Sequence, residues 1–128
     1  MISEDYVSLE IAKLLKEKGF DEGCSFVVNA ISKSVMPVSW PTTNSDIEDE
    51  KINLIALPTL QMSMKWLREV HKIYIDISPT YCEVEKTIHF IWQILDSNYD
   101  VVGDCEIFYG KYETACEEAI KYCLENLI

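Results

Sequence analysis

The sequence predicts an α+β protein in which a mostly antiparallel sheet packs with about three helices, in the order α-β-β-α-β-β(β)-α. Segments in which apolar and polar residues alternate are typical of half-buried antiparallel strands. Segments with apolar residues three and four positions apart are typical of amphipathic helices. The chain has 128 residues, of which 48% are hydrophobic. This size and composition predict one globular domain over residues 1–128.

The N-terminal part predicts a helix followed by a hairpin. Ser8 is a suitable N-cap because a serine oxygen can accept a hydrogen bond from a first-turn amide, with Ser3 as a rival start. Gly19 suits the residue that terminates this helix. The alternation over residues 24–31 predicts a strand. Residues 35–40 predict its hairpin partner, and the proline within them places that partner at a sheet edge.

The middle of the chain predicts a loop and a second helix. Residues 41–50 are polar, rich in turn formers and acidic at their end, which predicts a surface loop. A short apolar run over residues 52–57 follows. Thr59 is a plausible N-cap for a helix from Leu60 to about His71.

Three strands and a final helix are predicted after this point. Residues 73–77 alternate and predict a strand that ends before Pro79, and residues 87–95 predict another. The odd-numbered positions of residues 105–109 suggest a short last strand. The helix that begins near Tyr112 has the clearest pattern in the chain. Its apolar stripe consists of Tyr112, Ala115, Cys116, Ala119, Ile120, Cys123, Leu124 and Leu127.

The net charge narrows the classes of partner. The chain has 11 Lys+Arg and 22 Asp+Glu, for a formal charge of −11. Residues 73–128 alone have a net charge of −8. Phosphate neutralisation requires a surplus of basic residues, so direct binding of nucleic acid is disfavoured. The same deficit disfavours docking onto an anionic membrane surface, so neither nucleic acid nor membrane is an expected partner.

The cysteines and histidines do not predict a catalytic or metal site. The five cysteines form no C-x-x-C pair, and no export signal is visible at the start of the chain, which predicts reduced thiols and a cytoplasmic location. Cys24 with His71 or His89 is a conceivable nucleophile–base pair, but nothing in their spacing favours it. We therefore predict no enzymatic activity, no cofactor and no metal. A small hydrolase or transferase remains an alternative.

A candidate interaction surface is predicted from exposed aromatic, arginine and acidic residues. Tryptophan and arginine are common anchors of protein interfaces. For Trp66 the pattern favours packing beside the helical stripe of its segment, with Arg68 in water, and for Trp40 packing in the core is an equal alternative to exposure. The acidic run from residue 46 to residue 50 fits a solvated loop better than a calcium loop. The predicted surface consists of Trp40, Asp46, Glu48, Asp49, Glu50, Trp66 and Arg68.

Three stretches carry a resemblance to known proteins. They are residues 8–21, residues 58–71, with Pro58-Thr59 and Trp66-Leu67-Arg68-Glu69, and residues 112–120. In this order they resemble small uncharacterised proteins of phages and prophages of gut Bacteroidales. The layout is more distantly similar to phage helix–strand–helix sandwich domains of unknown function. The resemblance implies a one-domain accessory protein of a bacterial cytoplasm, and it implies no catalytic residue.

The function expected from these observations is a non-enzymatic accessory or interaction module with an unknown protein partner. The alternative is an acidic inhibitor that mimics nucleic acid and blocks a host DNA-binding enzyme. That alternative requires carboxylates along one face of the protein. The edge strand at residues 35–40, with Trp40, also offers a route to a homodimer.

Overall fold

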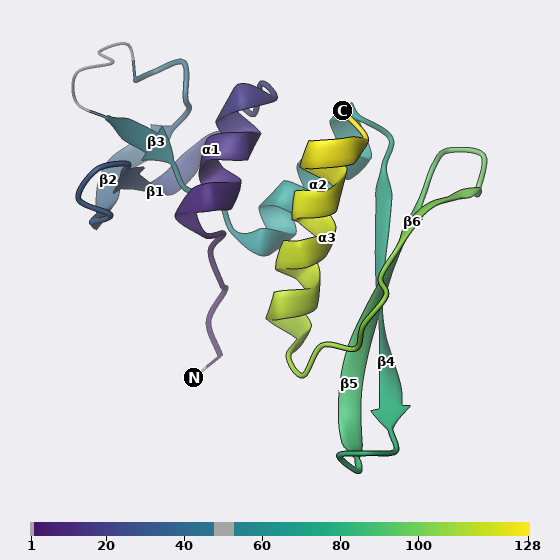
Figure 1. Ribbon diagram of the computed structural model, residues 1–128. Helices are drawn as coiled ribbons and strands as arrows, with labels where there is room; N and C mark the ends of the chain where they lie inside the picture. The colour runs from purple at the N-terminus through teal and green to yellow at the C-terminus, as the bar shows by residue number, and fades with distance from the viewer. Residues whose placement is uncertain (1, 48–52) are drawn as a thin grey trace. The chain divides into compact units, whose positions relative to one another are not determined.

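The computed structural model describes residues 2–47 and 53–128 and confirms the α+β class. Its elements follow the order α1, β1, β2, β3, α2, β4, β5, β6, α3 (Figure 1). The strands form two separate three-stranded sheets, and every strand pair in them is antiparallel. The sequence predicted one mostly antiparallel sheet. The antiparallel pairing is confirmed, but the strands are divided between two sheets.

The chain forms two compact units, residues 1–59 and residues 60–128, which are described separately. The first unit contains one helix and one sheet, and the second contains two helices and the other sheet. The expectation of a single domain over residues 1–128 stays a prediction.

Helix α1 (Leu9–Glu17) begins and ends where its sequence signals predict. The Ile11 N–H donates to the Ser8 Oγ at 3.3 Å, so Ser8 is the cap and the rival start at Ser3 is not used. Gly19 follows the helix with φ +90°, a conformation that glycine adopts without the penalty a side chain would bring. The buried side of the helix consists of Ile11, Ala12 and Leu15.

The first sheet has the strand order β2-β1-β3. Strand β1 (Cys24–Asn29) pairs with β2 (Val35–Thr42), which confirms the hairpin and its edge position. Strand β3 (Leu54–Ala56) lies on the other side of β1. The sequence indicated only an apolar run at this position, because three residues are too few for an alternation to be visible.

Asn44 joins the loop after β2 to the free edge of β3. Its Oδ1 accepts from the Ala56 N–H at 2.9 Å, and its Nδ2 donates to the Phe20 carbonyl at 2.8 Å. Next to it, the Ser45 N–H donates to Asp21 Oδ1 at 2.7 Å. This backbone hydrogen bond lowers the pKa of the Asp21 carboxyl from 3.8, because it stabilises the charged form. The described part of the predicted surface loop is therefore held by hydrogen bonds.

Replacing Asn44 by alanine is expected to lower the free energy of unfolding of residues 1–59 by about 2–3 kcal/mol. The change leaves a donor on Ala56 and an acceptor on Phe20 without their partner, and both residues are 1% exposed. Hydrogen exchange of the β1 and β3 amides measures the effect. Asn98→Ala, in an exposed turn, is the control and should be close to neutral. Equal exchange in the two variants would contradict the role of Asn44.

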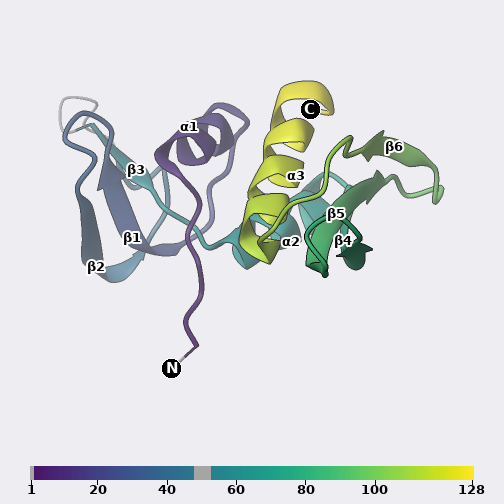
Figure 2. The same ribbon diagram turned by 60° about the horizontal axis from the view of Figure 1, so that its bottom comes forward.

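The second sheet has the strand order β4-β5-β6, with both helices of this unit on one face (Figures 1 and 2). Strand β4 (Tyr74–Cys82) pairs with β5 (Thr87–Leu95) along its full length. Strand β6 (Val101–Asp104) completes the sheet. Helices α2 (Leu60–Val70) and α3 (Tyr112–Asn126) pack against each other and against β4.

The predicted end of the strand before Pro79 is wrong, because β4 continues to Cys82. Pro79 lies opposite Phe90 in the ladder. The Phe90 N–H and carbonyl bond to Tyr109, on the far side of β5. Pro79 is therefore in a non-hydrogen-bonded pair, and its nitrogen points away from β5. Its missing N–H costs no bond in this sheet, which is why an edge strand tolerates it.

The predicted last strand over residues 105–109 is also displaced, because β6 ends at Asp104. The Cys105 N–H still donates to the Trp92 carbonyl at 3.2 Å, and the Trp92 N–H points to the Cys105 Sγ at 3.3 Å. Only Tyr109 pairs again, through an isolated bridge to Phe90. Residues 105–109 therefore alternate in sequence but form an irregular segment, which pairs with β5 as a bridge only at Tyr109.

Helix α3 covers the sheet with the stripe that the sequence predicts. Its six buried residues are Ala115, Cys116, Ala119, Ile120, Cys123 and Leu124. Two aromatic contacts fix it to β5: Trp92 with Tyr122, at 5.3 Å between ring centroids, and Phe90 with Tyr112, at 5.7 Å. Lys111 occupies the N-cap position and makes no side-chain capping bond.

Candidate functional site

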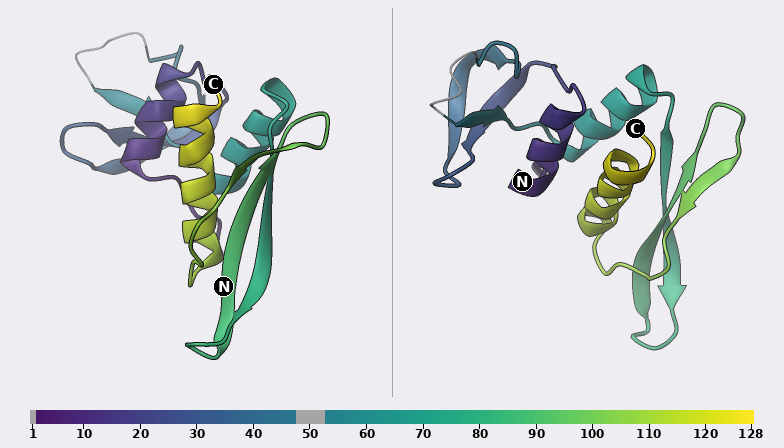
Figure 3. Two further views of the ribbon diagram at one scale, coloured as in Figure 1. Left: turned by 45° about the vertical axis from the view of Figure 1, so that its right-hand side comes forward. Right: turned by 45° about the horizontal axis from the view of Figure 1, so that its top comes forward.

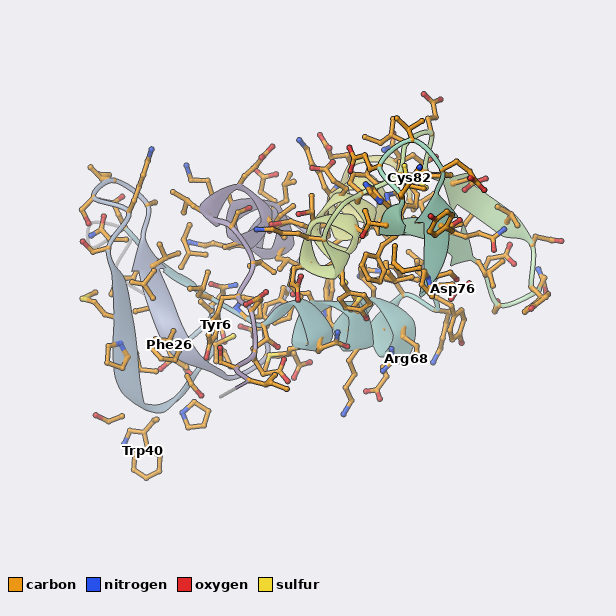
Figure 4. All side chains as sticks on the ribbon, turned by 90° about the horizontal axis from the view of Figure 1, so that it is seen from below. Tyr6, Phe26, Trp40, Arg68, Asp76 and Cys82 are labelled. Carbon is orange, nitrogen blue, oxygen red and sulfur yellow. The ribbon has the colours of Figure 1, made fainter. Side chains whose placement is uncertain are left out.

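Strand β2 exposes three large apolar side chains, those of Val35, Met36 and Trp40. Their exposed fractions are 55%, 40% and 80%. Figure 4 shows the Trp40 side chain pointing away from its strand. An indole is costly to leave in water, because each buried Å² of apolar surface contributes about 25 cal/mol. We refer to these three residues as the β2 ridge. The exposed fraction of Trp40 confirms it as an exposed aromatic.

A bulge in β2 explains why Trp40 points outward. Phe26 lies opposite Pro37 and Cys24 lies opposite Thr42, so the four residues between Pro37 and Thr42 face a single residue of β1. The extra residues cannot all join the ladder, and they are displaced from the sheet. The bulge depends on Gly23, since a Cβ there would lie 2.9 Å from the Cβ of Pro41.

The main-chain edge of β2 is less suited to binding than its side chains. Phe26 bonds to β3 through its carbonyl, which accepts from the Leu57 N–H at 3.0 Å. Its partner in β2, Pro37, therefore directs its backbone toward the free edge, where it has no N–H to donate. A proline and a bulge on an edge are two known means of preventing strand pairing. The β2 ridge is therefore suited to side-chain contacts.

The acidic residues of the predicted surface are only partly described. Asp46 is exposed, and its Oδ2 accepts from the Thr43 N–H at 3.0 Å, so its carboxylate closes a turn. Glu48, Asp49 and Glu50 lie outside the described residues.

Trp66 is the predicted surface residue whose placement argues most strongly against an anchor role. It is 6% exposed, and its ring meets the His71 ring edge-on at 4.7 Å. The packing interpretation of Trp66 therefore describes its position. Arg68, two residues further along α2, is exposed (Figure 4).

The conceivable catalytic residues show no activated nucleophile. Burial raises the pKa of the Cys24 thiol to about 11, with a smaller contribution from Glu22, so the reactive thiolate is disfavoured. His89 pairs with Glu85 at 3.0 Å, and its Nδ1 has no hydrogen-bond partner among the described residues. In residues 2–47 and 53–128, no three His, Cys, Asp or Glu side chains are grouped to hold a metal ion.

The net charge of the chain is divided almost equally between the two units. Residues 1–59 have ten acidic and five basic side chains, and residues 60–128 have twelve and six. Their net charges of −5 and −6 are nearly equal, because α2 and the turn after it add Lys65, Arg68 and Lys72 to the second unit. The carboxylates of residues 60–128 come from α2, the strands and turns of the sheet, and α3.

A second apolar surface, which the sequence pattern did not predict, lies at the end of the β4–β5 hairpin. Tyr81 and Ile88 form a cross-strand pair, and each is 51% exposed, while Val84 in the turn is 91% exposed. The hairpin extends past the start of α3 (Figure 3), so the sheet face covered by α3 continues without a helix. The sequence shows the apolar alternation, but the length of α3 relative to the hairpin decides which residues stay uncovered.

Comparisons with known proteins identify no relative, since no family model, no curated protein and no solved structure matches the chain. None of the helices in the described residues is long and apolar enough to cross a membrane.

Proposed function

We propose that this protein is a non-enzymatic interaction module, derived from a phage or prophage, that binds a partner protein through the β2 ridge. The observation that carries this proposal is the exposed Trp40 indole on an edge strand that also exposes Val35 and Met36. Buried tryptophan side chains contribute much of the energy of protein interfaces. The fitting partner is a protein with an apolar pocket that accepts this indole.

Two further observations support this proposal. The β2 ridge carries no charged side chain, so its burial needs no paired charge on the partner. Pro41, which follows Trp40 in β2, lies close to Gly23, so the chain next to Trp40 is packed against the segment before β1. A preordered anchor loses less conformational entropy on binding than a mobile one.

Trp40→Ser is expected to reduce the affinity for this partner about 30-fold or more. The measurement is a quantitative pull-down from a Bacteroidales lysate with wild-type and variant protein, followed by titration of the retained protein. Tyr99→Asn is the matched control, because Tyr99 is 82% exposed but lies in a turn of the other unit. A partner retained equally by wild type and Trp40→Ser would contradict the proposed surface.

The acidic mimic of nucleic acid is the second candidate, and the net charge of −11 favours it. Its binding would depend on carboxylates, so it would weaken steeply with salt and would not respond to Trp40→Ser. Binding through the β2 ridge has the opposite signature, because burial of apolar surface is insensitive to moderate salt. Repeating the titration over a range of salt concentrations separates the two candidates.

A further inference from the structure

The two sheets have four outer edges, and three of them are blocked against strand pairing. The β2 edge has Pro37 and a bulge. The β3 edge is three residues long, and its Ala56 N–H is already bonded to Asn44. Strand β6 has four residues and a shift of register beside Leu95. Short strands, prolines, bulges and covered edges all protect proteins against unwanted pairing.

The fourth edge, on β4, is long and rich in free hydrogen-bonding groups. Strand β4 has nine residues and no register shift against β5. Since the backbone of Pro79 points away from β5, the alternation of an antiparallel ladder points Ile75, Ile77 and Tyr81 the same way. This edge therefore offers donors on three residues and acceptors on four. Only the Pro79 donor is missing.

We propose that β4 pairs antiparallel with β4 of a second copy of this chain, and that the two-fold axis passes beside Ser78. In this register Ile75 faces Tyr81 of the partner copy, and Ile77 faces Pro79. About six hydrogen bonds then join the two copies. The β4-β5-β6 sheet of one copy and that of the other become a single six-stranded sheet. The missing Pro79 donor removes one bond from each of the two central pairs.

The side chains of β4 are self-complementary in this register. On the helix-bearing face, the half-exposed Tyr81 meets Ile75 of the partner copy, an aromatic–β-branched pair of the kind that stabilises sheets. On the other face, Asp76 meets Thr80, and Ser78 meets Ser78. The single charged residue of β4 therefore has no like charge directly opposite, which is the arrangement that a symmetric pair requires.

The register centred on Ser78 keeps the carboxylates of the two copies apart. Residues 60–128 have a net charge of −6, and β4 carries the Asp76 carboxylate. Pairing of two copies is therefore unfavourable in any register that places carboxylates opposite each other. The register centred on Ser78 separates the two Asp76 side chains by four residues along the strands, about 13 Å. The residue at the axis is thus Ser78 from both copies, and the residue opposite each Asp76 is Thr80 of the other copy.

Light scattering over about 1 μM to 1 mM protein tests the pairing through Ser78→Asp. Two aspartates at the axis would oppose each other, and each would also lie near Asp76, whose Oδ2 accepts from the Ser78 Oγ at 3.3 Å, so the dimer dissociation constant should rise about tenfold or more. Ser78→Asn is the matched control, of the same shape without the charge, and should keep a mass of about twice 14.8 kDa. We expect both variants to keep the monomer fold, and circular dichroism checks this.

Disulfide trapping tests the register itself. Ser78 would form a non-hydrogen-bonded pair with its own copy, with Cα atoms about 4.5 Å apart, which suits a disulfide. In a chain with Cys82 and Cys105 replaced by serine, Ser78→Cys should therefore oxidise to a covalent dimer. Ser97→Cys, in the exposed turn after β5, is the control and should remain monomeric.

The outcomes are decisive in either direction. A dimer that is weakened by Ser78→Asp and trapped by Ser78→Cys supports pairing through β4. A chain that is monomeric up to 1 mM overturns the proposal, and so does a dimer that Ser78→Asp leaves intact. A dimer lost only in Trp40→Ser would move the interface to the β2 ridge.

Discussion

Replacing Gly103 by alanine is expected to lower the free energy of unfolding of residues 60–128 by about 2–3 kcal/mol. Gly103 lies in β6 under the ring of Tyr122, and an added Cβ would lie 2.6 Å from its Cε1 atom. The same Cβ would lie 3.2 Å from the Ile94 Cδ1. Tyr122 cannot simply rotate away, because its ring packs on Trp92. The added methyl must therefore displace α3 or the strand.

Urea unfolding of Gly103→Ala, followed by tryptophan fluorescence and circular dichroism, measures this loss. Gly110→Ala is the matched control, since a Cβ there has no atom within 4 Å, and it should be close to neutral. The double variant Gly103→Ala/Tyr122→Leu should recover at least about 1 kcal/mol relative to the sum of the single changes. A stable Gly103→Ala, or strict additivity, would show that the ring does not press on this strand.

The five cysteines are expected to divide into two reactive and three protected thiols. Burial raises the pKa of Cys24 and of Cys116 to about 11, and that of Cys123 to about 12. Cys82 and Cys105 are only partly buried. At pH 8 a thiol with a pKa of about 11 is ionised to about one part in a thousand, and only the thiolate reacts. Labelling in the native state should therefore modify Cys82 and Cys105 first.

Mass spectrometry after timed alkylation at pH 8 assigns the modified residues. We expect the three buried thiols to react at least about 100-fold more slowly than the other two, and to react fully in denaturant. Rapid native labelling of Cys123 would contradict its burial in the α3 stripe. Cys82→Ala/Cys105→Ala is the control variant, and it should show almost no native labelling.

The same thiols give the stability a defined dependence on alkaline pH. A raised pKa in the folded state means that the native chain holds protons that the unfolded chain releases near pH 9. Their contribution is therefore complete below about pH 9, and it is lost as the pH rises toward 11. Cys123→Ala should lower stability at pH 7, where a small cavity remains, but it should flatten the alkaline loss relative to wild type.

Local periodicity predicted the elements that depend on neighbours in sequence. The α3 stripe and the alternation of β5 both follow from residues within about fifteen positions, and both elements lie where they were predicted. The strand end predicted before Pro79 is wrong, although a proline removes a donor from the ladder. Whether that donor is needed depends on Phe90, whose bonds go to Tyr109, and no local pattern contains this information.

The candidate surface was predictable only where exposure is itself local. Trp40 stands beside a proline in an edge strand, and it is exposed as expected. Trp66 has a similar local signal, but the packing of α2 buries it against His71. The free edge of β4 depends on the position of each strand in its sheet, which the order of elements alone does not reveal.

The first turn of α3 is the part of this helix that we expect to unwind most easily in residues 60–128. Without a side-chain bond from Lys111, the first-turn amides lack one of their usual partners, and the buried stripe begins only at Ala115. The first turn can therefore unwind while the rest of the helix stays packed. Unwinding withdraws Tyr112 from Phe90 and adds Phe90 to the apolar surface already exposed at Tyr81 and Ile88. We expect the area of that surface to increase whenever this helical turn unwinds.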